Sequence, residues 1–131
     1  FGSNNDGYDF HINQRDLEFL LNVTTDYVAK LACTEPVKML YFNEKCVEFI
    51  GVPAEILASP TYDALSQIYP EDLDKVREVL ENTKHDKKSF SVTCRFLHYD
   101  GHVFPVRMDG IYVNELYENK YPVLYVLCFK M

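Results

Sequence analysis

Two histidines come closest to a metal-binding set in this 131-residue sequence. His98 and His102 flank the stretch from Tyr99 to Gly101. If that stretch is a three-residue reversal between two strands, the two imidazoles face each other and can approach one metal ion. Two ligands are too few for a protein metal site, and no nearby cysteine, glutamate or third histidine completes a set. We therefore predict a solvated hairpin tip without a metal.

Residue sets that support catalysis are missing from the sequence. It contains no Gly-x-Ser-x-Gly nucleophile motif, no glycine-rich phosphate loop and no carboxylate pair in a convincing cleft. Glu71 and Asp72 follow Pro70, and we expect them to stabilise the positive end of a helix dipole. His85, among lysines at the far end of that helix, is expected beside the negative end. The chain is predicted not to be an enzyme.

Composition restricts the partners and the location of the chain. Twenty acidic and thirteen basic side chains give a net charge of −7, which repels phosphate backbones and argues against nucleic acid. The longest apolar run, 123–129, is far shorter than the ~20 residues of a membrane helix, so we predict no direct membrane insertion. A longer parent protein could still be membrane-attached. Four cysteines without a close pair suggest reduced, buried thiols in the cytoplasm, with a disulfide as the alternative.

The elements that must position the two histidines are the strands before and after the turn. Apolar residues occupy every second position: Phe90, Val92, Cys94 and Phe96 before the turn, and Phe104, Val106 and Met108 after it. A two-residue loop would shift the register and expose one of these rows. A three-residue loop with Gly101 in the left-handed conformation instead pairs Phe96 with Phe104. We predict the three-residue loop.

Hydrophobic spacing and capping residues predict the other elements. A loose leader covers 1–13. The expected helices are 14–24 (apolar at Leu17, Leu20 and Leu21), 44–50 between Asn43 and Gly51, short pieces at 53–57 and 61–68, and 70 to about 82. The other expected strands are 27–33, 37–42 and 122–130, the last after a polar loop at 114–121. This order predicts a single α+β domain over 14–131, with one antiparallel sheet and helices on one face.

Three strings in this order resemble the PAS domain family. Leu40–Gly51 resembles the strand, asparagine and helix that open these domains. Tyr69–Val76 is similar to their His-Pro-Glu-Asp helix signature, with Tyr69 in place of the histidine. Arg95–Gly101, followed by Phe104, is similar to their Arg-Phe-x-x-x-Asp-Gly hairpin. The resemblance covers about residues 26–130 and implies a five-stranded sheet ordered 2-1-5-4-3, whose inner face and helices enclose a small pocket.

The resemblance implies a sensory or relay module without catalysis. Such a module binds a small ligand or a partner and passes its state to an attached output, such as a histidine kinase or a diguanylate cyclase. The helix at 14–24 resembles an N-terminal cap helix that contributes to homodimers. It could equally cover the outer sheet face of its own subunit, over Leu97, Val103 and Val126. A polar, titratable pocket would instead indicate an autonomous enzyme that binds a small molecule.

The implied pocket has an aromatic and polarisable wall that suits a small apolar or planar ligand. Its expected lining is Tyr41, Phe49, Ile56, Ile68, Val92, Cys94, Phe96, Val106, Met108 and Tyr125. The alternative is that these bulky side chains fill the space themselves, which would leave a closed-core homodimerisation module with no ligand.

Neither flavin nor haem is predicted as a cofactor. The string Thr93–His98 resembles the Asn-Cys-Arg-Phe-Leu-Gln string of flavin-binding light sensors, whose cysteine attacks the flavin. That cysteine lies on a helix before the long helix, whereas Cys94 follows the long helix within a strand. Haem-binding relatives place their ligand deep in the long helix. The matching inward positions here are Val76, Val79 and Leu80, which cannot ligate iron.

Overall fold

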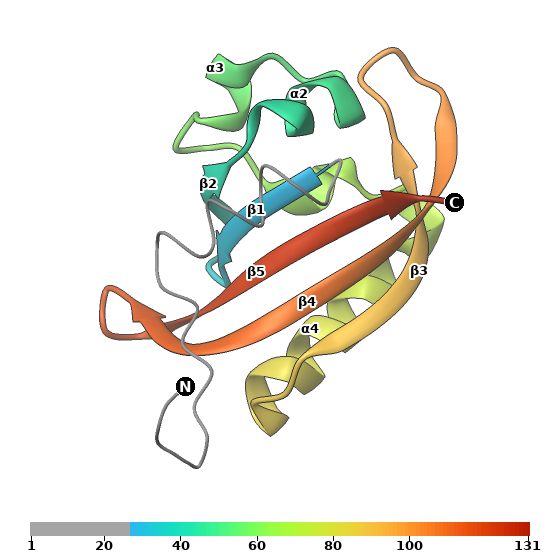
Figure 1. The fold of residues 1–131 in the computed structure, drawn as a ribbon. Coiled ribbons are helices and arrows are strands. Elements are labelled where there is room, and N and C mark those ends of the chain that lie inside the picture. Colours follow the sequence, from blue (N-terminus) through green and yellow to red (C-terminus); the bar gives the residue numbers. More distant parts are fainter. Residues whose placement is uncertain (1–26) are drawn as a thin grey trace, which may run out of the picture.

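The computed structural model describes residues 27–131, which form a five-stranded antiparallel sheet accompanied by short helices (Figure 1). The elements in chain order are β1 (Tyr27–Ala32), β2 (Lys38–Phe42), α2 (Glu44–Ile50), α3 (Ala54–Leu57), the 3₁₀ helices η1 (Ala64–Gln67) and η2 (Pro70–Asp72), α4 (Leu73–Asp86), β3 (Phe90–Leu97), β4 (Val103–Tyr117) and β5 (Tyr121–Lys130). The strand order is β2-β1-β5-β4-β3, which confirms the predicted sheet. The predicted leader and cap helix, with Leu17, Leu20 and Leu21, lie outside the described residues.

The β3–β4 hairpin has the predicted register. Phe96 pairs with Phe104, and Leu97 with Val103, across a tip that contains Gly101 at φ 102°. Because the pairing preserves the alternation of both strands, one apolar row of the hairpin faces the helices. The loop length, and not only the strand pattern, therefore determines which side chains reach the core.

Four aromatic rings from four different elements meet at the centre of the core. The Phe96 ring on β3 lies 6.1 Å from Tyr27 on β1, 5.9 Å from Phe49 on α2 and 6.0 Å from Phe104 on β4, measured between ring centroids. The contacts of Phe96 with Tyr27 and Phe49 are edge-to-face, a favoured arrangement for aromatic pairs. This cluster joins the two halves of the sheet to α2.

The ends of α2 are specified by its flanking residues, as predicted. The Asn43 side-chain oxygen accepts hydrogen bonds from the backbone N–H of Cys46 at 3.2 Å and of Val28 at 3.3 Å. It therefore caps the helix and ties it to β1. Gly51 ends the helix at φ 77°, and its N–H donates to the carbonyl of Val47 at 2.7 Å.

An ion pair joins the start of α4 to β3. The Asp72 carboxylate accepts from Arg95 Nε at 3.0 Å and Nη2 at 2.8 Å, and from the Arg95 backbone N–H at 2.7 Å. Asp72 lies at the start of α4, as expected, but its carboxylate makes no capping hydrogen bond to that helix. These Arg95 hydrogen bonds, first those of the side chain and then that of the backbone, lower the pKa of Asp72 to about 2. Two of the strings that resemble PAS domains are thus physically connected.

We expect Asp72→Asn to lower the melting temperature at pH 7, because it removes the charged partner of Arg95. The folded pKa of about 2 lies below the usual value near ~3.9, so the stabilisation is present above about pH 4 and is lost as the pH falls through about 2. The gap in melting temperature between wild type and variant should therefore narrow on acidification. Glu71→Gln, whose carboxylate is 3.7 Å from Arg95 and exposed, is the control. Equal losses for both variants would contradict this role of Asp72.

Two predicted boundaries are wrong. The helix expected to end near residue 82 continues to Asp86, where Lys87 at φ 58° donates its N–H to the Thr83 carbonyl and closes it. The polar loop expected at 114–121 is largely strand, because β4 runs to Tyr117 and β5 begins at Tyr121. A short turn with Glu118 and Asn119 at positive φ replaces the loop. In both segments, polar residues continue the helix or strand and do not mark its end.

All four cysteines are free, and three of them are buried. Burial raises the pKa of Cys46 to about 12 and that of Cys94 to about 11. Cys33 is only partly buried and lines a shallow hollow beside α4. Three thiols are therefore protected from chemical modification, because they are buried and because they stay protonated.

In native protein at pH 8 we expect Ellman's reagent to modify Cys33 alone. The thiolate population of Cys46 is roughly 10³-fold below that of an ordinary thiol. Unfolding in guanidinium should release all four thiols, and Cys33→Ser should abolish the native-state reaction. Rapid native modification of two or more thiols would contradict the buried placement.

Candidate functional site

The side chains predicted to line a pocket mostly pack against one another. Phe49, Ile68, Cys94, Phe96, Val106 and Met108 are all buried in the main core cluster, and Val92 packs against it. The inner face of the sheet is thus apolar, as its alternation indicates, but its centre is occupied by these side chains. Space for a ligand lies at the margins of this cluster.

Tyr41 and Tyr125 were assigned to the wrong face of the sheet. Tyr41 is paired with Lys30, Lys30 with Tyr125 and Tyr125 with Ile111, so the four residues form one row across β2, β1, β5 and β4. Directly opposite residues share a face. Tyr125 belongs to a second buried cluster with Val28, separate from the core under the helices. Neither tyrosine lines a pocket on the inner face.

The misassignment has a physical cause. Residues 123–129 are apolar at every position, so the sequence does not reveal which alternate set faces the helices. Val126, expected on the outer face, belongs to the main core for the same reason. In β2, a register shift opposite Lys30 and Leu31 changes the phase of the side chains.

A cavity of about 200 Å³ lies between α3 and the tip of the β3–β4 hairpin, and we call it the α3–hairpin cavity. Its lining is Ile50, Val52, Ile56, Tyr62, Ser66, Gln67, Leu97, His98 and Tyr99. Of the predicted pocket residues, Ile56 belongs to this wall. Apolar walls with a few convergent polar groups are the usual composition of a small-molecule site.

The polar groups of this cavity include one without a partner. The Tyr62 hydroxyl is buried and makes no hydrogen bond among the described residues. Burial raises the pKa of Tyr62, and its polar neighbours Ser66 and Gln67 oppose that rise without reaching hydrogen-bond geometry. Gln67, in contrast, is occupied: its Oε1 accepts from the Tyr27 hydroxyl at 2.9 Å. The Tyr62 O–H is therefore a buried donor available to a ligand oxygen.

The mouth of the cavity is attached to the end of α2. The Tyr99 backbone N–H donates to the Ile50 carbonyl at 2.9 Å. The His98 ring packs on Gly51 so closely that a Cβ at Gly51 would lie 2.2 Å from His98 Cε1. The hairpin tip and α2 therefore hold one rim of the cavity in a defined position.

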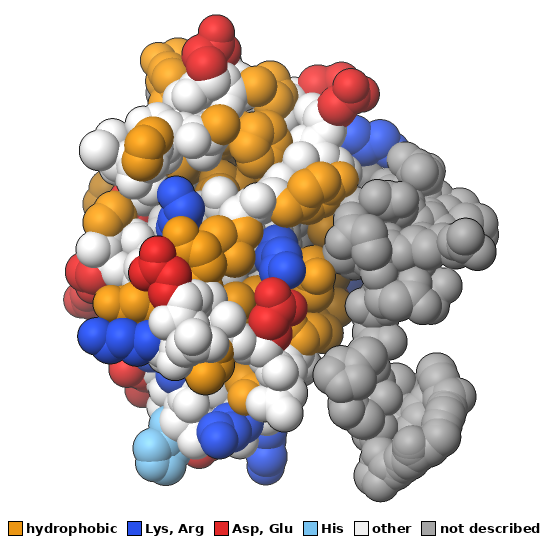
Figure 2. All heavy atoms as spheres, turned by 90° about the vertical axis from the view of Figure 1, so that its left-hand side faces the viewer, with side chains coloured by type: hydrophobic (Ala, Val, Ile, Leu, Met, Phe, Trp, Pro, Cys, Tyr) orange, Lys and Arg blue, Asp and Glu red, His pale blue; other side chains and the backbone are white. Residues whose placement is uncertain are grey.

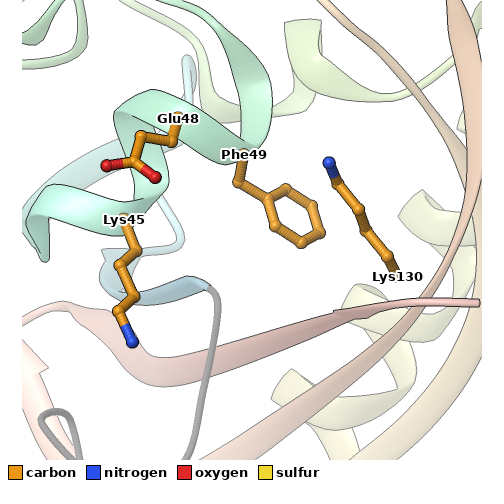
Figure 3. A pocket seen from close by; sticks show the side chains of 4 residues that line it. All are labelled: Lys45, Glu48, Phe49 and Lys130. Atoms are coloured by element: carbon orange, nitrogen blue, oxygen red, sulfur yellow. The ribbon is translucent and has the colours of Figure 1, made fainter.

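A second, larger cleft of about 350 Å³ lies between α2 and the end of β5 (Figure 3). Among the described residues it is lined by Lys45, Glu48, Phe49 and Lys130. Figure 3 shows Phe49 projecting from α2 toward Lys130 on β5. Lys130 Nζ lies 5.3 Å from the ring centroid of Phe49 and 5.1 Å from that of Phe104, so its charge is already held by two aromatic faces. This cleft offers mainly charged groups and little apolar surface.

The face turned to the viewer in Figure 2 carries hydrophobic side chains interspersed with acidic and basic ones.

A third hollow of about 160 Å³ lies between β1, the β1–β2 turn and α4. Its rim includes Glu35 beside Arg77 at 3.9 Å and Glu81 beside Lys84 at 2.7 Å. The charged groups of this rim pair with one another, whereas the α3–hairpin cavity contains a buried hydroxyl without a partner. We therefore favour the α3–hairpin cavity as the candidate site.

Sequence reasoning missed Tyr62, Ser66 and Gln67 as cavity residues. Their segment is a loop followed by the 3₁₀ helix η1, with no periodicity long enough to define an inward face. Asp63 holds it in place: its Oδ1 accepts from the N–H of Leu65 at 3.0 Å and of Val37 at 3.2 Å. An aspartate before a short polar helix was the available signal for a cap, but it does not indicate a cavity.

These features define a class of protein. The antiparallel strand order β2-β1-β5-β4-β3, together with short helices and a small cavity beside the hairpin tip, defines an α+β module. The family model described as the PAS fold matches residues 39–125, and the chain belongs to this family. The PAS assignment made from the three strings is therefore confirmed. A search of curated proteins finds no match.

Solved structures of the same fold include sensors attached to different outputs. The N-terminal domain of a diguanylate cyclase with a PAS/PAC sensor from Marinobacter aquaeolei is 19% identical, with a TM-score of 0.64, over 79% of this chain and 93% of that one. A PAS domain from a two-component sensor histidine kinase is 17% identical, with a TM-score of 0.62, over 90% and 100%. The Rhodobacter sphaeroides LOV protein is 9% identical, with a TM-score of 0.67, over 91% and 68%. At these identities the likeness shows the fold alone.

The residues present do not fit a covalently reacting flavin or a haem ligated from α4. Cys94 lies on β3, after α4, and η1 before α4 contains no cysteine. Cys46 on α2 is fully buried, and its thiol donates to the Val28 carbonyl at 3.3 Å. The buried side chains of α4 are Val76, Leu80 and Thr83, which are not iron ligands. Neither flavin nor haem therefore enters the function proposed for this chain.

Among the described residues, no helix has the length and apolar character needed to cross a membrane.

Proposed function

We propose that this PAS domain is a sensory or relay module that binds a small, mainly apolar and planar ligand in the α3–hairpin cavity. The single observation that carries this is the buried, unpartnered Tyr62 hydroxyl in a wall that also contains the apolar side chains of Ile50, Val52, Ile56 and Leu97. A buried donor without a partner is costly, and a ligand carbonyl or hydroxyl oxygen would satisfy it. The cavity volume of about 200 Å³ is below the usual range for drug-sized ligands, so the ligand is small.

The proposed signal is a change at the rim of this cavity. His98 and Tyr99 belong to the hairpin tip, and Ile50 belongs to α2, so a ligand touches two elements at once. A ligand that binds one relative placement of these elements better shifts the population toward it. An attached histidine kinase or diguanylate cyclase is the kind of output that would read the shift. The four free cysteines support a cytoplasmic setting.

The test uses acetophenone, a small planar ketone, as the probe. Titration into ¹⁵N-labelled protein should shift amide resonances around Val52, Ser66 and Tyr99, which line the cavity. Tyr62→Phe should weaken acetophenone about 5- to 10-fold, the value of one hydrogen bond. The same variant should melt at or above the wild-type temperature without ligand, because it removes an unsatisfied buried hydroxyl.

Tyr99→Phe is the matched control, since Tyr99 lines the mouth and is 61% exposed. Its affinity for acetophenone should equal that of wild type. Native mass spectrometry of freshly purified protein would also report any ligand carried from the host. An unchanged spectrum at saturating probe would contradict the proposal and favour a closed-core homodimerisation module, which light scattering would show as a dimer.

A further inference from the structure

The tip of the β3–β4 hairpin brings together three groups that can bind a metal. His98, Asp100 and His102 each offer one ligand atom, and these atoms lie within 4.8 Å of one another. Asp100 Oδ1 is 2.6 Å from His102 Nδ1 and 3.1 Å from His98 Nδ1. The two imidazole rings are stacked, with centroids 4.5 Å apart and planes at 20°. The expectation of two ligands only overlooked the aspartate between them.

Backbone hydrogen bonds fix this arrangement. The His98 N–H donates to the His102 carbonyl at 2.8 Å, and the Gly101 N–H donates to the His98 carbonyl at 2.8 Å. The His102 N–H donates to Asp100 Oδ1 at 2.9 Å. Alternate residues of an extended strand would be separated along its length, but the reversal at Gly101 makes these three converge. The turn therefore holds the three side chains close together.

His98 is also held from the side opposite the turn. Its ring packs on Gly51, and its side chain is only 20% exposed. The histidine on α4 differs: His85 is 89% exposed and contacts a single carboxylate, that of Asp86, at 2.9 Å. Among residues 27–131, the three His–Asp contacts thus provide an internal comparison between a converged set at Asp100 and an isolated pair at Asp86.

We propose that His98, Asp100 and His102 bind a divalent late first-row transition metal ion of the Zn²⁺ type. Two imidazoles and one carboxylate leave a fourth position for water, a common zinc arrangement. Tetrahedral bonds of about 2.0–2.2 Å separate neighbouring ligand atoms by roughly 3.4 Å, and the two stacked rings must turn out of their parallel arrangement so that one nitrogen of each points to the ion. Imidazole ligands disfavour Mg²⁺ and Ca²⁺, which require mainly oxygen donors. The metal would replace the hydrogen bond between His102 and Asp100 and, when it binds His98 Nδ1, also the hydrogen bond that this nitrogen accepts from the Asp100 N–H at 3.1 Å. Its binding does not depend on a ligand in the α3–hairpin cavity.

Isothermal titration of the full chain with ZnCl₂, free of any affinity tag and treated with chelator beforehand, tests this site. We expect one equivalent bound, and a loss of affinity of at least about 10-fold in His102→Gln and in Asp100→Asn. His102 is exposed, so its substitution should leave the fold intact, which circular dichroism checks. The resonances of the His98 and His102 rings should shift or broaden on adding Zn²⁺ and remain unchanged on adding MgCl₂.

His85→Gln and His11→Gln are the controls, because they remove the other two histidines of the sequence. Both should bind Zn²⁺ like wild type. The proposal is overturned if Zn²⁺ gives no saturable binding, if His102→Gln binds as tightly as wild type, or if the affinity is lost in either control instead.

Discussion

Replacing Phe96 by alanine is expected to lower the free energy of unfolding by about 3–5 kcal/mol, the range for truncating a large buried aromatic side chain. Phe96 is 2% exposed, and its ring touches those of Tyr27, Phe49 and Phe104. Alanine removes these contacts and leaves a cavity where four elements meet, so neighbouring side chains can close it only in part. Because a domain of this size has about 5–15 kcal/mol of stability, the variant should be marginally folded.

Denaturation in urea, followed by circular dichroism, measures this loss. Phe129→Ala is the control, because Phe129 is on β5 of the same sheet, is only partly buried and stacks with Arg107 at 4.4 Å. We expect about 1 kcal/mol for Phe129→Ala, the usual size for a partly exposed residue. Equal losses for the two variants would show that the aromatic cluster is not the centre of the core.

The hairpin and α2 could be predicted from sequence because their determinants are local. A three-residue turn with Gly101 sets the register of β3 and β4, and alternation gives each strand a buried face. Asn43 and Gly51 mark the two ends of α2 through hydrogen bonds within a few residues. The predicted hairpin register and the predicted ends of α2 are confirmed, because single residues in the turn and at the helix ends meet the geometric requirements there.

The phase of β5 could not be predicted, because both of its faces are covered. Tyr125 and Val126 are 7% and 2% exposed on opposite faces, so hydrophobicity does not distinguish them. Only the pairing with β1 and β4 resolves the ambiguity, and pairing is a tertiary property. The boundary of α4 failed for a related reason: polar residues at its end remain helical until Lys87 closes it.

The residues of the candidate sites are close together in space, and the sequence alone does not show this proximity. Tyr62 and Gln67 reach the same cavity as His98, although they are about thirty residues away along the chain. His98, Asp100 and His102 alternate in the sequence, but the position of Asp100 beside Gly101 indicates a turn residue and not a metal ligand. A tight turn uses Asp100 for both purposes, since its carboxylate accepts the His102 N–H and faces both imidazoles.

Both proposals place function at the contact between the hairpin tip and the end of α2. The cavity rim and the three metal ligands share His98, which packs on Gly51. The placement of His98 is therefore the feature that the two proposed sites have in common. Gly51 is the position at which this placement can be tested without substituting a ligand group.

Gly51→Ala is expected to destabilise the domain by about 2–3 kcal/mol. Gly51 has φ 77°, where an alanine costs roughly 1–2 kcal/mol of backbone strain. The new Cβ would also lie 2.2 Å from His98 Cε1 and 2.6 Å from Nε2, so the imidazole must leave its position. Loss of that position should weaken Zn²⁺ binding if the proposed metal site exists, and urea denaturation measures the stability change.

Gly101→Ala separates the two causes, because Gly101 has φ 102° but nothing within 4 Å of an added Cβ. We expect it to cost only the strain, roughly 1–2 kcal/mol. In a His98→Ala background the cost of Gly51→Ala should fall to that same level, since the steric partner is gone. If Gly51→Ala costs no more than Gly101→Ala in the wild-type background, His98 does not rest on α2, and the hairpin tip is not held there.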